Sequence, residues 1–218
     1  MTLSEAAALA QRLRAAVANE RVLAAVASIP RERFVPEGEM LRAYENVALP
    51  IACGQTISQP LVVARMLEAL DPKPGERVLD IGTGSGYHAA LLALLTGHVW
   101  TIERHPELTA EAERAIWGLG IENVTFVVAD GTEGLPAEAP FDGINVAAAT
   151  GDAVARSLEQ QLAVGGRLVA PVGNRQQHLV LTERTPAGFD RQRLEAVRFV
   201  PLVRGPGRAP DPRPPDTN

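Results

Sequence analysis

The chain has 218 residues, of which 46% are hydrophobic and 22% are charged. This is the composition of an ordinary globular protein that is long enough to form one well-packed domain. The formal net charge of −5 provides no basic surface, so avid nonspecific binding to nucleic acid or to an anionic membrane is not expected.

The N-terminal residues 2–28 predict one or two amphipathic helices that pack on the core. Leu9 and Leu13 mark the apolar positions, while Arg12 and Arg14 interrupt any signal-peptide core. No apolar run approaches the ~20 residues that are needed to cross a bilayer. We therefore expect a cytoplasmic protein that does not bind membranes.

The single cysteine, Cys53, excludes an intrachain disulfide and fits a reducing compartment. No basic residue lies close to it in the sequence, so we interpret Cys53 as a spectator rather than a nucleophile.

Residues 78–86, reading VLDIGTGSG, are the most informative stretch of the chain. A short apolar run of this kind suits a buried parallel strand, and residues 87–95 predict the helix that follows it. The glycines between them allow the backbone to approach a ligand without a Cβ in the way. These glycines stand at alternate positions: Gly82, Gly84 and Gly86.

The turn does not fit a phosphate-binding loop, because no Gly-Lys-Ser/Thr sequence follows Gly86. It does not fit a dinucleotide site either, because Tyr87 occupies the place of the third glycine and Asp80 is an awkward neighbour for a diphosphate. S-adenosylmethionine carries no phosphate. Asp80 could orient the ammonium end of its methionine moiety or the nearby network, so the pattern favours this cofactor.

Two further apolar runs end in acidic residues. Residues 99–102 lead into Glu103, about 20 residues beyond the turn, where a βαβ unit returns an acid to a ribose, so we predict that Glu103 binds the ribose hydroxyls. Residues 124–129 lead into Asp130 and Gly131, and Asp130 could accept a hydrogen bond from the adenine amino group. Strand-end acids also cap helices or face solvent, but three in register with a glycine turn favour a ligand site.

The remaining pattern predicts an α/β fold with a doubly wound, mostly parallel, Rossmann-like sheet. Helices are expected near residues 106–119 and 152–163. Two runs with no helix between them are expected to form an antiparallel C-terminal strand pair. Residues 1–203 are predicted to be a single domain, and residues 204–218, rich in Pro, Gly, Arg and Asp, a disordered tail. The later strands are expected at 143–148, 167–172, 178–182 and 197–202.

The sequence argues against a nucleobase substrate. Residues 142–149, which span the expected fourth strand and its end, lack the Pro-Pro-aromatic run that grips a flipped base. Cys53 follows Ala52 rather than the proline that commonly precedes a nucleophile for pyrimidine carbon. Aromatic residues make up only 4% of the chain, which leaves little for base stacking.

Specific motifs identify the family that the chain resembles. Residues 54–60 read GQTISQP, residues 30–36 read PRERFVP, and residues 197–202 read VRFVPL. With these motifs the chain closely resembles the protein-L-isoaspartate (D-aspartate) O-methyltransferases, from about residue 22 to residue 203. The glycine turn alone would fit almost any methyltransferase.

The resemblance implies an S-adenosylmethionine-dependent enzyme with an altered strand arrangement at its C-terminal side. The substrate would be the free carboxylate of L-isoaspartyl (and D-aspartyl) residues in damaged proteins and peptides. Ser58 matches the active-site serine of this family. The residues alone favour a different role, in which Ser58 is the N-cap of the helix that begins near Pro60. The segment that closes over the cofactor would be Gln55, Thr56 and Ile57, with Thr56 also beside the substrate; the strand beside the substrate peptide would be Val200, Pro201 and Leu202. The cofactor-binding turn and strand ends would be Asp80, Gly82, Thr83, Gly84, Ser85, Gly86, Glu103, Asp130 and Gly131.

Four positions depart from the family pattern. Two of these departures concern the part of the site that would bind the substrate, because one removes a hydroxyl group and the other removes a charge. These are Ala147, where a threonine is usual, and Asn46, where an aspartate is common. The others are Ala52 and Ala129, at positions that are often glycine.

The chemistry needs no general base, since an isoaspartyl carboxylate has a pKa near ~3.5 and is ionised at neutral pH. No metal is expected, and we assign the histidines to surface or packing roles because they lack ligand spacing: His88, His98, His105 and His178. A monomer is the expected state. Two alternatives stay open: esterification of an aspartate in a dedicated partner peptide, and a catalytically silent S-adenosylmethionine-binding homologue.

Overall fold

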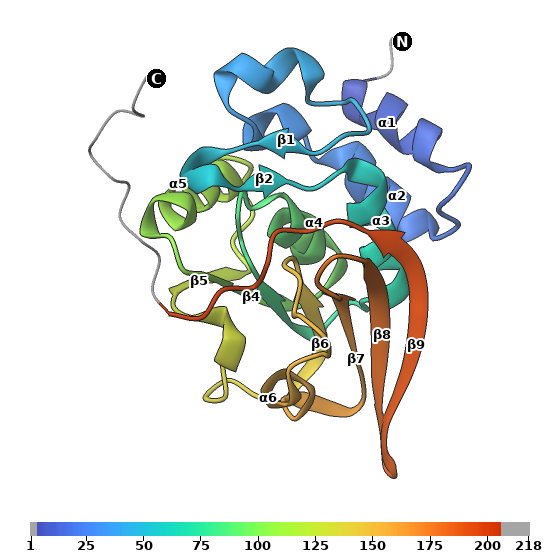
Figure 1. The fold of residues 1–218 in the computed structure, drawn as a ribbon. Coiled ribbons are helices and arrows are strands. Elements are labelled where there is room, and N and C mark those ends of the chain that lie inside the picture. Colours follow the sequence, from blue (N-terminus) through green and yellow to red (C-terminus); the bar gives the residue numbers. More distant parts are fainter. Residues whose placement is uncertain (1–3, 206–218) are drawn as a thin grey trace.

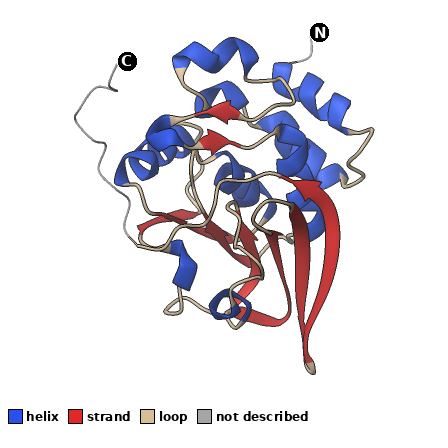
Figure 2. Ribbon diagram, in the orientation of Figure 1, coloured by secondary structure: helices blue, strands red, loops and turns tan. Residues whose placement is uncertain are grey.

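A computed structural model describes residues 4–205. Its largest element is a seven-stranded sheet in the order β5-β4-β3-β6-β7-β8-β9. The pairs from β5 across to β7 are parallel, and β7–β8 and β8–β9 are antiparallel (Figures 1 and 2). The strands are β3 (Arg77–Ile81), β4 (His98–Glu103), β5 (Val124–Val128), β6 (Phe141–Val146), β7 (Leu162–Val172), β8 (Gln177–Thr185) and β9 (Gly188–Val197). The predicted mostly parallel sheet with antiparallel C-terminal strands is confirmed.

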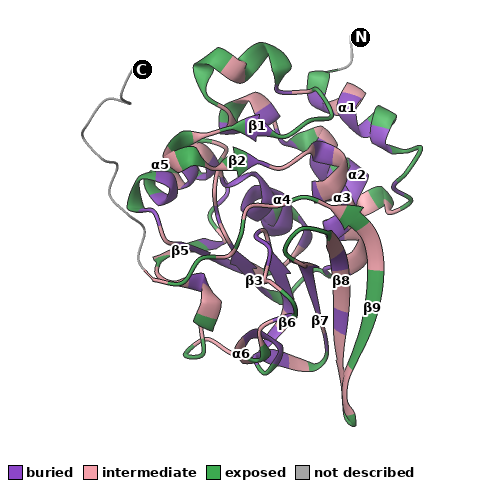
Figure 3. Cartoon of the chain, viewed as in Figure 1, coloured by how far each residue is buried: buried purple, intermediate pink, exposed green. Residues whose placement is uncertain are grey.

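The longer helices pack mainly on one face of this sheet. Side chains alternate along each strand, so Val78 belongs to the core under these helices while its neighbour Leu79 belongs to the core on the other face. The helices are α1 (Glu5–Leu13), α2 (Glu20–Ser28), α3 (Pro60–Leu70), α4 (Tyr87–Leu95), α5 (Pro106–Trp117) and the short α6 (Arg156–Glu159). Helix α4 is buried on nearly all sides (Figure 3), as expected for a helix that is apolar all round. Short elements complete the fold: η1 (Arg31–Phe34), η2 (Glu37–Arg42), β1 (Leu49–Pro50), η3 (Ala52–Gly54), β2 (Thr56–Ile57) and η4 (Gly131–Glu133).

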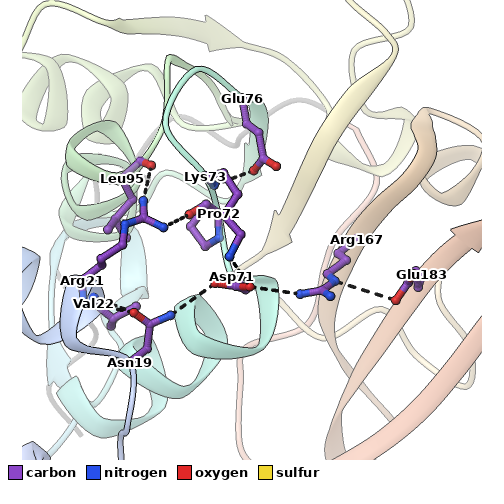
Figure 4. A network of polar contacts seen from close by, with 10 residues as sticks. All are labelled: Asn19, Arg21, Val22, Asp71, Pro72, Lys73, Glu76, Leu95, Arg167 and Glu183. Atoms are coloured by element: carbon purple, nitrogen blue, oxygen red, sulfur yellow. Dashed lines mark hydrogen bonds and ion pairs between the residues drawn. The ribbon is translucent and has the colours of Figure 1, made fainter.

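The N-terminal helices are attached to the sheet layer by a polar network (Figure 4). Arg21 of α2 donates a hydrogen bond to the carbonyl of Leu95 at the end of α4 (2.9 Å). Asn19 donates to Asp71 (3.3 Å), and Asp71 also pairs with Arg167 of β7 (3.5 Å). Helices α1 and α2 thus contribute buried residues to the same core as α3 and α4.

Several expected elements have different bounds in the structure; for example β7, expected at 167–172, begins at Leu162. The helix expected at 152–163 is only the four-residue α6, because its flanks are committed to other contacts. Gly151 bridges to Gly173, and Leu162 already pairs with Phe141 as the start of β7. The strand expected at 143–148 is β6, which ends at Val146, so the two alanines after it belong to a loop.

The prediction that residues 197–202 form the second strand of the C-terminal pair was wrong. The partner of β8 is β9, which follows a two-residue turn in which Thr185 faces Gly188. Its sequence is rich in exposed polar residues because β9 is an edge strand. Residues 198–202 instead run as an extended segment along the ends of the parallel strands, held by hydrogen bonds from Ala149 N to Val200 O and from Leu202 N to Ala149 O (both 2.8 Å).

The chain beyond this segment contacts the body at three points, the first being a hydrogen bond from Arg104 Nη1 to Val203 O (3.3 Å). Arg204 pairs with Glu133 (2.8 Å), and Gly205 N donates to Asp130 (2.5 Å). The rest of the predicted tail, residues 206–218, lies outside the described residues. Among residues 4–205, no helix has the length and apolar character required to span a bilayer.

Candidate active site

The glycine turn lies at the point in the sheet where the chain order reverses, with β3 between β4 and β6. Ligands of open α/β sheets bind in the crevice at such a switch point, beyond the carboxyl ends of the strands. Gly82 and Gly84 both have positive φ angles (90° and 51°), which glycine adopts at little cost. Gly82 N and Thr83 N both donate to Ile102 O at the end of β4 (2.9 and 3.2 Å).

A cavity opens above this turn, and we call it the main cavity. It is partly open to solvent and is lined by both polar and apolar residues. Most of the residues predicted from the sequence line it: Gln55, Thr56, Ile57, Ser58, Gly82, Thr83, Gly84, Ser85, Glu103, Gly131, Val200, Pro201 and Leu202. Five separate segments of the chain therefore meet at one place.

Glu103 ends β4 with its side chain in the main cavity, 7% exposed. Oε2 accepts a hydrogen bond from Gly84 N (3.0 Å), and Oε1 accepts from Arg104 N and His105 N (2.8 and 3.1 Å). A carboxylate oxygen has two lone pairs, so Oε2, which accepts one hydrogen bond, has one lone pair left. The carboxylate is thus fixed in position and retains acceptor capacity toward the cavity.

Asp80 lies beneath the turn and not among the residues that line the cavity. It is fully buried, and its carboxylate accepts hydrogen bonds from Thr101 Oγ1 (2.8 Å) and Asn145 Nδ2 (2.7 Å). Thr101 in turn contacts Thr83 through their hydroxyls (2.6 Å). Burial raises the pKa of Asp80 to about 6, although its two hydrogen bonds act in the opposite direction. Of the two roles considered for Asp80, the geometry favours support of the network under the turn.

Gly86 and Asp130 also lie outside the cavity lining, and each has a structural reason. A Cβ on Gly86 would lie 2.8 Å from the Cβ of Ala112, so this glycine allows α4 and α5 to pack closely. Asp130 caps η4 by accepting from Thr132 N (2.9 Å), and its other oxygen accepts from Gly205 N. Its pKa is lowered by these hydrogen bonds, against a desolvation that alone would raise it.

Ser58 lies between the main cavity and a second hollow, the side groove. The two share Thr56, Ser58, Ala147 and Val200. The side groove is lined in addition by Ala48, Gln59, Val62 and residues 196–199. The shared residues form the junction of the two hollows.

Ser58 does not cap α3, contrary to the alternative drawn from the residues alone. The N-cap is Gln59, without a side-chain hydrogen bond, and Asn46 Oδ1 accepts from Leu61 N instead (3.0 Å). Among the described residues nothing hydrogen-bonds to the Ser58 hydroxyl, which leaves it available at the junction.

Sequence reasoning missed the contribution of helix α4. Tyr87 and His88, in its first turn, both line the main cavity. Burial raises the pKa of Tyr87 to about 12 and lowers that of His88 to about 4, so both are neutral at pH 7. An apolar helix has no pattern that shows which residues face a ligand; their position directly after the turn was the one available signal.

Comparison with known proteins agrees with this geometry. A sequence profile described as protein-L-isoaspartate(D-aspartate) O-methyltransferase matches residues 4–207. The chain belongs to this family. It is 50% identical over 189 residues to a protein-L-isoaspartate O-methyltransferase of Vibrio cholerae, covering 87% of this chain and 90% of the relative. It is 52% identical over 190 residues to protein-L-isoaspartate O-methyltransferase 2 of Marinobacter nauticus, covering 86% of each.

Two solved structures of isoaspartate methyltransferases share the fold. One protein-L-isoaspartate O-methyltransferase has a TM-score of 0.82 at 30% identity, over 91% of this chain and 66% of the other. A Plasmodium falciparum protein described as a putative member, solved with S-adenosyl-L-homocysteine, has a TM-score of 0.77 at 26% identity, over 91% of this chain and 98% of the other.

Proposed function

We propose that this protein transfers a methyl group from S-adenosylmethionine to the free carboxylate of L-isoaspartyl and D-aspartyl residues in damaged proteins. The observation that carries the proposal is the junction at Ser58, where the main cavity above the glycine turn meets the side groove. Family membership and the close relatives named for this activity support it.

The residues that line the main cavity fit S-adenosylmethionine. Glu103 offers a fixed carboxylate to a ribose diol, and Gly82 and Gly84 leave room for close approach of a ligand. Gln55, Thr56 and Ile57 would close over it from the β1–β2 side. When bound, the cofactor supplies a methyl group on a positively charged sulfur, and Gly131 would help to line its site.

The protein's own contribution is to position the acceptor. An isoaspartyl carboxylate, with a pKa near ~3.5, is already ionised at neutral pH and needs no general base. Ser58 would donate a hydrogen bond to one carboxylate oxygen and hold the other toward the main cavity. Residues 200–202 and Ile57 would exclude water, so that proximity and orientation supply most of the acceleration.

Later steps of repair need no protein group. In the methyl ester, the backbone nitrogen of the next residue attacks the ester carbonyl, and methanol leaves with the amide proton. The resulting succinimide is hydrolysed by water to a mixture of aspartyl and isoaspartyl peptide. Repeated cycles convert isoaspartyl peptide to the normal linkage.

This conversion is the test of the proposed function. The protein is incubated with excess S-adenosylmethionine and an isoaspartyl peptide, and the two linkage isomers are separated chromatographically over time. We expect steady accumulation of the aspartyl peptide, and no change when the cofactor is omitted. An isoaspartyl peptide that persists while a protein substrate is methylated would favour a dedicated partner instead.

Three further points belong to this proposal. We place the protein in the cytoplasm, on the basis of its single cysteine. We infer no nucleic-acid partner, from its negative charge. We infer a monomer, since the edge strand β9 carries exposed charged side chains such as Asp190 and Arg193, which oppose strand pairing between copies.

A further inference from the structure

Three side chains with metal-binding atoms meet beside the main cavity. Cys53 lies in η3, between β1 and β2, whereas His105 immediately precedes α5 and Glu107 is in its first turn. One ligand atom from each lies within 4.8 Å of the other two. The fold thus joins residues that are more than fifty positions apart, which no sequence spacing could indicate.

The imidazole of His105 is the feature that points to a ligand. His105 is only 9% exposed, and its Nδ1 is buried with no hydrogen-bond partner. Within residues 4–205, neither ring nitrogen makes a hydrogen bond. A buried polar atom without a partner costs about 1–3 kcal/mol, and a bound cation would satisfy one ring nitrogen.

We propose that Cys53, His105 and Glu107 form a binding site for a thiophilic divalent cation, with Zn²⁺ as the best fit. Sulfur, imidazole nitrogen and carboxylate oxygen are the three ligand types that Zn²⁺ takes in proteins, usually with tetrahedral geometry. Water would occupy the fourth position. The site goes beyond the proposed methyl transfer and does not depend on it.

The geometry requires only a small adjustment. Bonds of ~2.0–2.3 Å in a tetrahedron place ligand atoms roughly 3.3–3.8 Å apart, so the longest separation would shorten by about 1 Å. The Glu107 side chain is exposed and free to rotate inward. One thiolate and one carboxylate would balance the ionic charge of +2, and Glu111, one helical turn further along α5, adds to the negative field at Cys53.

The position of the site gives it a structural consequence. Residues 51–55 form a tight turn held by hydrogen bonds from Ile51 N to Gln55 O (2.9 Å) and from Gln55 N to Ala52 O (3.1 Å). A bound ion would tie this turn to the start of α5, next to the segment that continues to Ser58. We therefore expect Zn²⁺ to raise the melting temperature of the protein.

Cobalt absorption tests the thiolate ligand directly. Because the chain has one cysteine, a thiolate-to-cobalt charge-transfer band in tag-free protein titrated with Co²⁺ reports on Cys53 alone. We expect this band in the wild type, its loss in Cys53→Ser, and its displacement by Zn²⁺. A wild-type protein without the band would overturn the proposal.

Zinc affinity measured by competition with a chromophoric chelator tests the carboxylate. Glu107→Gln removes an exposed ligand and should weaken binding at least about 100-fold, the upper end of what an outer-sphere partner contributes. The matched control is Glu111→Gln, which removes the same charge from the same helix and should change the affinity by less than about 3-fold, since exposed charges couple weakly. Equal affinities in the two variants would show that only the electrostatic field matters and would refute the site.

Discussion

At the scale of single residues, Asp80 is notable because its carboxyl group is fully buried and accepts hydrogen bonds from the neutral side chains of Thr101 and Asn145. Within residues 4–205 no ion pair to Asp80 is present, and burial raises its pKa from 3.8 to about 6. Asp80 therefore organises the residues beneath the turn at a cost in stability when it ionises.

This cost predicts a pH dependence of folding. Between about pH 4 and pH 6 the folded state holds a proton that the unfolded state has released, so the free energy of unfolding should fall as the pH rises, by at most ~3 kcal/mol. The amide of Asp80→Asn does not titrate in this pH range, so the variant lacks this pH-dependent contribution to the free energy of unfolding. Urea denaturation of both proteins from pH 4 to 7 should show the stability of the variant gaining on the wild type up to about pH 6. A constant difference would contradict the raised pKa.

Ser58 should affect the substrate and not the cofactor. Ser58→Ala removes a hydrogen bond to a charged oxygen, worth ~1.5–3 kcal/mol, so kcat/KM for an isoaspartyl peptide should fall about 10- to 100-fold. The dissociation constant of S-adenosylmethionine, measured by calorimetry, should change by less than about 2-fold. Ser28→Ala, whose hydroxyl bonds to Ala24 O within α2, is the distant control. Weakened cofactor binding with unchanged peptide kinetics would contradict the assigned role.

The absence of a general base has its own kinetic signature. His88 lines the main cavity, but with a pKa lowered to about 4 it does not change charge near neutrality. The single-turnover rate should therefore be nearly flat between about pH 6.5 and 8.5, since the attacking carboxylate is ionised throughout. A steep rise of the rate with pH would reveal a base that this mechanism lacks.

At the scale of elements, the contact between α4 and α5 depends on Gly86. Gly86→Ala would place a Cβ 2.8 Å from Ala112 at a φ of +88°, and overpacking added to backbone strain should destabilise the protein by roughly 2–4 kcal/mol. Gly165→Ala has a similar φ of +85° with nothing within 4 Å, so it should show the strain alone, about 1 kcal/mol. Equal losses in urea denaturation would exclude the packing explanation.

Elements with local signals were predictable from the sequence. Helix α4 has the predicted bounds because it begins directly after the last glycine of the turn, and its apolar run ends at Leu95, before Thr96. The shortened α6 and the edge strand β9 were not predictable, since α6 is limited by the pairing of Leu162 with Phe141 and β9 by its hairpin with β8. In both cases contacts between distant segments override the local pattern.

At the scale of the whole molecule, the main cavity is assembled from segments far apart in the chain. Its motif-bearing parts, such as the glycine turn and Glu103, could be predicted because each ends a recognisable strand. That His88 and His105 also line the main cavity could not be predicted, because it depends on how α4 and α5 are oriented on the sheet. The junction between cavity and groove likewise required the fold, because residues 56–58 and 196–200 meet only there.

The most direct measurement is transfer of labelled methyl groups to a matched pair of peptides that differ only in isoaspartyl or aspartyl linkage. The purified protein is incubated with methyl-labelled S-adenosylmethionine and each peptide, and base-labile label is counted as methanol. We predict label on the isoaspartyl peptide alone. Label on neither peptide, with cofactor binding intact by calorimetry, would contradict isoaspartyl methylation and direct the search to a dedicated partner or a binding role.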